Sequence, residues 1–157
     1  MKKSLAPADA SPTVPSSSWP LLLTTQAVLT EQIEQRLAAA GQPSLVWYDV
    51  LWALERAPER RLRMHELAES LVLTRSNLSR LVDRLAAAGL LTRAPDPDDR
   101  RGAYASLSEQ GAVVRKTMWL HYSAAIDQLY DAQLTADEQR VLCGALRKVL
   151  AAARPPR

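Results

Sequence analysis

Apolar side chains recur at helical spacing along most of this chain of 157 residues. A first helix is predicted from about Trp19 to a stop at Gly41 and Pro43, because residues at one-turn and two-turn intervals are apolar. Its stripe consists of Leu22, Leu29, Ile33 and Leu37. A second helix is predicted over about 45–57, capped by Ser44. Its inward residues are Trp47, Val50, Leu51 and Leu54.

Residues 64–91 predict two helices separated by a short turn. The first covers about 65–71. The second is longer, with Thr74 as its cap, a last turn near Ala88 and a stop at Gly89. Its apolar positions follow the i, i+3, i+4, i+7 rule and are Leu78, Leu81, Val82 and Leu85. Two helices so closely joined, the second amphipathic and basic, predict a helix-turn-helix.

A β-hairpin is predicted directly after this unit. The segments "LLTRAP" (90–95) and "AYASL" (103–107) both alternate, and Pro97 and Gly102 lie between them. Such a pattern is typical of two strands with a long connecting tip. A hairpin that follows a recognition helix is a wing. A short further strand is expected around Leu62.

The rest of the sequence is helical in pattern. Ser108 caps a helix to about residue 131, and Thr135 with Glu138 fits the T-x-x-E capping box of a last helix. The stripe of that helix is wide: Val141, Leu142, Ala145, Leu146, Val149 and Leu150. The predicted fold is therefore mainly α with a small β-hairpin wing, a winged helix-turn-helix joined to helices that dimerise.

Composition sets the boundaries of this picture. Residues 1–18 are rich in Ser, Pro and Ala without periodicity and predict a disordered arm, while 153–157 form a tail. The single cysteine, Cys143, excludes a disulfide within the chain, fits a reducing cytoplasm and is expected to be buried. We find no signal peptide and no membrane span, so a cytoplasmic protein is predicted.

The charge balance is mildly basic: 20 Lys and Arg against 17 Asp and Glu give +3. This permits a nucleic-acid partner without requiring one, so the placement of the charges decides. The predicted recognition helix carries slim polar residues and arginines at and after its start: Thr74, Arg75, Ser76, Asn77, Ser79, Arg80 and Arg84. Arg80 and Ser76 are expected to reach base edges and Arg84 a phosphate. The alternative is an ordinary solvated helix face.

The octet "PDPDDRRG" (95–102) mixes opposite charges at the wing tip. With Arg93, its arginines are balanced by an equal number of aspartates, so simple attraction of phosphate does not explain it. An aspartate that fixes the rotamer of an arginine does explain it, because an arginine so aimed can enter a narrow minor groove. A flexible charged loop is the alternative reading.

At this point the chain resembles the MarR family of bacterial winged-helix regulators over about residues 20–152. The family pattern D-x-R-x5-L-[TS] is matched by Asp99, Arg101, Leu107 and Ser108. The resemblance implies that Asp99 braces Arg101 in the minor groove and that Arg100 faces phosphate.

The resemblance also implies a homodimer. The dimerisation helices would lie in 19–43 and 108–152, and the DNA-binding part would cover 44–107. The wide stripe of the last helix agrees with this expectation. The expected interface residues are Leu22, Leu29, Leu142, Leu146 and Val149.

Aromatic residues cluster on the second helix, where most are expected in the core. Many members of the family bind aromatic acids in a cleft between the dimerisation and DNA-binding parts. By that resemblance, a small aromatic effector is a further hypothesis. The candidate contacts are Trp19, Tyr48, Asp49, Trp52 and His121.

Catalytic chemistry is not readable in the sequence. His65-Glu66 opens like a zinc-protease helix, but Glu69 stands where H-E-x-x-H requires histidine. No catalytic set, metal site or cofactor is predicted, so an enzyme is the weaker reading. We predict a dimeric transcription repressor that binds double-stranded DNA at a pseudo-palindromic operator. The alternative is a winged-helix protein-interaction module without DNA affinity.

Overall fold

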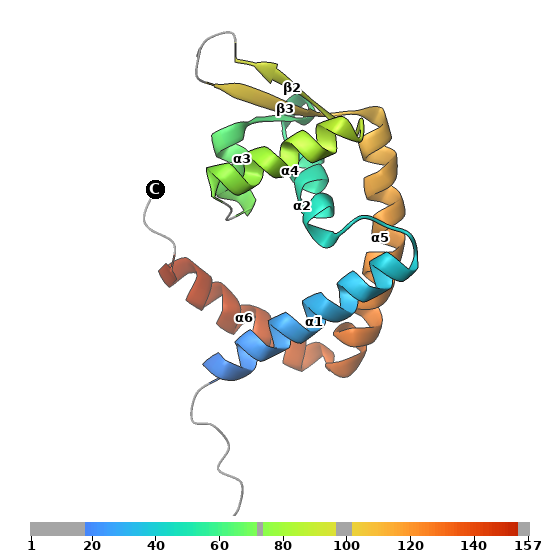
Figure 1. Cartoon of the computed structure of the whole chain (residues 1–157). Coiled ribbons are helices and arrows are strands. Elements are labelled where there is room, and N and C mark those ends of the chain that lie inside the picture. The colour runs from blue at the N-terminus through green and yellow to red at the C-terminus, as the bar shows by residue number, and fades with distance from the viewer. Residues whose placement is uncertain (1–17, 72–73, 97–101, 154–157) are drawn as a thin grey trace, which may run out of the picture.

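The computed structural model of the chain describes residues 18–71, 74–96 and 102–153, and the side chain of Arg75 lies outside the description. Helices dominate, and a small sheet lies at one end of the molecule (Figure 1). The helices are α1 (Trp19–Ala39), α2 (Leu45–Arg56), α3 (Met64–Leu71), α4 (Arg75–Ala87), α5 (Glu109–Leu129) and α6 (Ala136–Ala153). The strands are β1 (Arg61–Arg63), β2 (Leu91–Pro95) and β3 (Ala103–Leu107).

A hydrophobic core lies between α2, α3, α4 and the sheet. The predicted stripe of α4 is fully inward: Leu78, Leu81, Val82 and Leu85 are buried. From α2, the buried members are Val50, Leu51 and Leu54, while Trp47 is only partly buried. Burial of one face leaves the opposite face of α4 to solvent, which is what an amphipathic helix of this pattern predicts.

The hairpin prediction is confirmed. β2 and β3 pair antiparallel, β1 adds to the free side of β3, and the sheet order is β1-β3-β2. The expected short strand around Leu62 is β1, in which Leu62 lies opposite Ala105. Below the tip, the Asp96 backbone N–H donates to the Gly102 carbonyl at 3.1 Å. This bond fixes the two ends of the wing loop.

The helix caps follow the predictions with one exception. The hydroxyls of Thr74 and Ser108 accept the Asn77 and Gly111 N–H groups, and the Thr135–Glu138 capping box is present. Ser44 takes the cap position of α2 but makes no side-chain cap bond, so that detail was wrong. A carboxylate from α1 satisfies the helix start instead, since Glu34 Oε1 accepts the Leu45 N–H at 2.9 Å.

The remaining helices lie at the end of the molecule away from the hairpin. α5 runs from the wing to this end, where α1 and α6 are found (Figure 1). A small second core joins α1, α2 and α5, and its buried members are Ile33, Leu37, Tyr48, Met118 and Ala125. α6 has no buried residue. Cys143 on α6 is exposed, so the expectation that it is buried was wrong; none of the described segments covers α6 closely enough to bury one of its side chains.

Candidate nucleic-acid interface

The polar face of α4 is presented to solvent beside the wing. Ser76, Asn77, Arg80 and Arg84 are exposed, on the side opposite the buried leucines. Thr74 is exposed too, but its hydroxyl caps the helix by accepting the Asn77 N–H at 3.4 Å. The structure thus brings most of the predicted recognition residues to one surface.

A second set of contacts fixes the orientation of α4. Arg93 on β2 pairs with Asp83 on α4, with Nη1 and Oδ1 2.9 Å apart, and the same nitrogen donates to the Ser79 hydroxyl at 3.3 Å. The Ser79 hydroxyl therefore already contacts the wing strand. Arg93 was not among the predicted site residues, because its role comes from a contact between α4 and β2 that sequence spacing does not reveal.

The base of the wing is held by a cluster that the sequence reasoning missed. Arg63 Nε lies 3.0 Å from Asp96 Oδ2 and donates to the Tyr104 hydroxyl at 2.9 Å. The Asp96 side chain is 1% exposed. The Tyr104 hydrogen bond, followed by the charge of Asp96, raises the pKa of Arg63. Asp96 and Arg63 thus anchor the point where the octet begins; the predicted Asp99, Arg100 and Arg101 lie outside the described residues.

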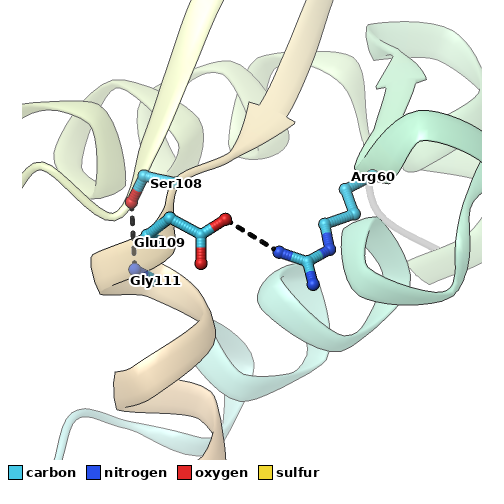
Figure 2. Close-up of polar contacts among 4 residues, drawn as sticks. All are labelled: Arg60, Ser108, Glu109 and Gly111. Atoms are coloured by element: carbon cyan, nitrogen blue, oxygen red, sulfur yellow. Dashed lines mark hydrogen bonds and ion pairs between the residues drawn. The ribbon is translucent and has the colours of Figure 1, made fainter.

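The start of α5 contacts the residues that follow α4, and Figure 2 shows the polar contacts of Ser108 and Glu109 at this helix start. The Ser108 hydroxyl accepts the Gly111 N–H at 2.9 Å and donates to the Gly89 carbonyl at 2.7 Å. A Cβ at Gly111 would lie 2.0 Å from the Leu90 carbonyl oxygen, so only glycine fits there. Beside it, Arg60 Nη1 pairs with Glu109 Oε1 at 3.1 Å. α5 therefore connects the hairpin directly to the far end of the molecule.

Only some of the residues predicted to contact an effector lie together in the structure. Tyr48, Asp49 and Trp52 line a cavity of about 430 Å³ between α2 and α5. Trp19 and His121 do not line it: Trp19 stands at the start of α1, and His121 is exposed. The α5 wall is formed by residues that the sequence analysis did not single out: Arg115, Trp119, Tyr122 and Ile126. Their i, i+4, i+7, i+11 spacing was the signal that could have found them.

The predicted interface residues carry exposed apolar surface. Leu22, Leu146 and Val149 are exposed, whereas Leu29 and Leu142 are partly buried. They are joined by further apolar residues on α1 and α6, among which Val141 is 72% exposed. Apolar surface of this extent is unusual on a soluble monomer.

Metal-binding groups and membrane-spanning helices would indicate other classes of function. Among the described residues, no group of histidine, cysteine and carboxylate side chains is arranged to hold a metal ion. Within the same residues, every helix is too short or too polar to cross a membrane.

A helix-turn-helix with an exposed polar recognition helix and an adjacent hairpin defines a winged-helix protein of the DNA-binding class. A family model described as "MarR family" matches residues 42–102. The Escherichia coli HTH-type transcriptional regulator PrsX is 30% identical over 123 residues, which are 78% of this chain and 73% of PrsX. The chain therefore belongs to the MarR family and is a transcriptional regulator, not an enzyme.

Solved structures agree with this assignment. Sco3205 of Streptomyces coelicolor, a MarR family regulator determined in complex with DNA, is 31% identical with a TM-score of 0.81, covering 88% of this chain and 87% of that one. PcaV from the same organism, determined with its natural ligand, is 28% identical with a TM-score of 0.69, covering 96% and 100%. The mainly helical winged-helix fold predicted from the sequence is thus confirmed.

Proposed function

We propose that the protein is a homodimeric repressor that binds a pseudo-palindromic operator in double-stranded DNA. α4 would enter the major groove and the wing arginine Arg101 the minor groove. The observation that carries the proposal is the exposed polar face of α4, held against the sheet by Arg93 beside the wing. The similar Sco3205 was determined in complex with DNA, which supports DNA as the partner; the proposed docking is that of helix-turn-helix proteins in general.

Direct readout follows from the position of each side chain on α4. Ser76, Asn77 and Arg80 stand in the first half of the helix, where base edges are within reach, and Arg84 stands one turn further on. Arg80 is proposed to fork onto a guanine and Arg84 to contact a phosphate. Arg75 belongs to the proposed contacts by its place in the sequence.

Dimerisation is proposed through 19–43 and 108–152, with 44–107 as the DNA-binding part. α6 has no buried residue within the chain, yet carries a row of leucines and valines. A two-fold partner would cover this row together with the exposed start of α1. It would also set two recognition helices about 34–36 Å apart, the repeat of B-DNA.

For the wing, we propose that Asp99 orients Arg101 and that Arg100 faces a phosphate. The Arg63–Asp96 pair at the end of β2, where the octet begins, supports this proposal. If the arginine is oriented before it meets DNA, the entropic cost of its insertion is lower.

A small aromatic effector is proposed to act at the cavity between α2 and α5. The cavity lies against α5, which the Ser108 and Gly111 contacts couple to the end of α4. A ligand that shifts α5 relative to α2 would therefore reposition α4 as well. The ligand complex of the similar PcaV supports an effector-regulated protein.

Selection of DNA from a random pool by the purified protein tests the proposal. We expect enrichment of an inverted repeat with half-sites about one helical turn apart, bound less tightly as salt rises. Failure to enrich any sequence, together with binding that is independent of salt, would favour the protein-interaction module instead.

A further inference from the structure

The cavity between α2 and α5 is walled by aromatic rings. Tyr48, which is 4% exposed, lies between two tryptophans: its ring centroid is 6.4 Å from that of Trp52 and 6.0 Å from that of Trp119, with interplanar angles of 20°. Tyr122 meets both Tyr48 and Trp119 edge-on. Both tryptophans keep about two fifths of their surface exposed, at 38% and 42%. Large rings left open around a cavity present their electron-rich faces to whatever enters it.

The positive charge at this cavity is already neutralised. Arg115 Nε lies 2.6 Å from Glu55 Oε2, and both side chains are largely buried. The Arg115 guanidinium also lies over the Trp52 ring, 5.1 Å from its centroid. An arginine paired and stacked in this way offers little to the carboxylate of an aromatic acid, because a second anion would have to compete with Glu55.

The negative charge at the cavity is not neutralised. Within the described residues, the partly buried Asp49 carboxylate has neither a hydrogen bond nor an ion pair. Burial, followed by the nearby carboxylate of Glu34, raises the pKa of Asp49. Arg56 lines the neighbouring cavity with Asp49 and Trp52, and its guanidinium lies over the Trp52 ring, 5.6 Å from the centroid. An acid so placed loses hydration without gaining a partner, which an incoming cation would correct.

We propose that the cavity takes an organic cation: an ammonium group on an apolar or aromatic body, with Asp49 as its counter-ion and the rings of Tyr48, Trp119 and Tyr122 as its cage. This differs from the aromatic acids that the family resemblance suggested, and the difference comes from the pairing of Arg115 with Glu55. Cation–π contact and a desolvated carboxylate act in the same direction here. That such a cation releases DNA rests on the proposed function; that it binds does not.

The binding test uses three probes of similar size and different charge on the full-length protein without DNA. Benzyltrimethylammonium is expected to bind at least about tenfold more tightly than benzoate or benzyl alcohol, as measured by calorimetry and by the change in tryptophan fluorescence. Equal or tighter binding of benzoate would overturn the proposal, and so would the absence of binding by all three probes.

Variants assign the charge preference to Asp49. Asp49→Asn should lower the affinity for benzyltrimethylammonium about tenfold or more and leave benzyl alcohol unchanged. Asp137→Asn on α6, an exposed acid outside the cavity, should leave both unchanged. Loss of affinity for both probes in a folded Asp49→Asn protein, or no loss for either, would contradict the counter-ion role. The comparison of probes on the unaltered protein decides the proposal even if this variant fails to fold.

A parallel titration on selected DNA separates the two proposals. If the protein selects an inverted repeat but does not prefer the cation, the cation proposal is wrong and the proposed function stands. If the protein prefers the cation but selects no DNA, the proposed function is wrong and the cation proposal stands. Saturating benzyltrimethylammonium is expected to weaken operator binding, and unchanged operator affinity would refute the coupling between the cavity and α4.

Discussion

The winged-helix region from α2 to β3 and the helices α1 and α6 at the other end differ in where their apolar side chains lie. From α2 to β3, the apolar stripes meet each other inside the chain, and residues such as Leu51, Leu67 and Leu85 are fully buried. At the other end, α6 has no fully buried residue, and the first half of α1 exposes Leu21 and Leu23. The first region buries its apolar stripes within the chain. The second leaves apolar side chains exposed on α6 and the start of α1, which is unusual for a soluble monomer.

This difference shows how the same sequence pattern leads to two outcomes. A leucine stripe is stabilising within one chain only if another element of that chain covers it, and otherwise it stabilises an assembly. The two regions should therefore respond to mutation in different ways. Substitutions in the first region change the stability of the chain, and those in the second change its association.

The largest effect is expected from Leu146→Asp on α6. A buried charge in a two-fold interface occurs twice, so the dimer should separate into folded monomers, as measured by sedimentation. Operator affinity should fall by about three orders of magnitude or more, because one half-site contact leaves mostly non-specific binding. Thr92→Asp, at an exposed position of β2 outside the proposed dimerisation segments, is the control and should remain dimeric. A stable Leu146→Asp dimer with full affinity would show that α6 is not at the interface.

Next in size is Leu85→Ala in the core under α4. Removing a fully buried leucine leaves a cavity, so the free energy of unfolding should fall by about 2–5 kcal/mol in urea titrations. Val113→Ala should change it by less than about 0.5 kcal/mol. If the loss in Leu85→Ala varied with protein concentration as strongly as that of an interface variant, the contrast between the two regions would be wrong.

Arg80→Ala and Arg84→Ala test the two kinds of DNA contact on α4. Losing a forked contact to guanine should cost about 1–3 kcal/mol in Arg80→Ala and relax the selected consensus at one base. Arg84→Ala should weaken all sequences alike and reduce the salt slope by about one. An unchanged consensus in DNA selected by Arg80→Ala would remove Arg80 from the base-reading residues.

The smallest change in operator affinity is expected from Asp99→Ala, and the direction of that change is informative. Asp99→Ala removes a negative charge near DNA, so electrostatics alone predicts tighter binding. If Asp99 orients Arg101, binding should instead weaken a few-fold, in the same direction as Arg101→Ala, by electrophoretic titration. Tighter binding by Asp99→Ala would leave the octet as a charged loop without a brace.

The local sequence pattern was sufficient to predict the helices and strands. It was insufficient to predict the contacts between them. The period of 3.6 placed α4 and its stripe within a residue or two, and turn residues placed the hairpin, because these signals act over a few positions. The Arg63–Asp96 pair joins residues 33 positions apart in the printed numbering, and only the sheet brings them together. Asp96 was counted among the charges of the octet, although its side chain is buried at the base of the wing.

The cavity shows the same limit at a candidate site. The aromatic cluster of α2 was visible in the sequence, but its partners on α5 are some seventy positions away. The other two candidates, Trp19 and His121, do not line the cavity. The pairing of Arg115 with Glu55, which decides the charge that the cavity prefers, joins two helices and has no local signature.

The central claim is that a two-fold dimer reads two half-sites on one face of the duplex. Inserting about five base pairs between the half-sites of the selected operator rotates them by about half a turn, and about ten restores their face. Binding of the unaltered protein is expected to involve two protomers per operator and to collapse toward non-specific affinity with the shorter insertion. Two results would contradict this claim: an affinity unchanged by the half-turn insertion, or full operator affinity with one protomer bound.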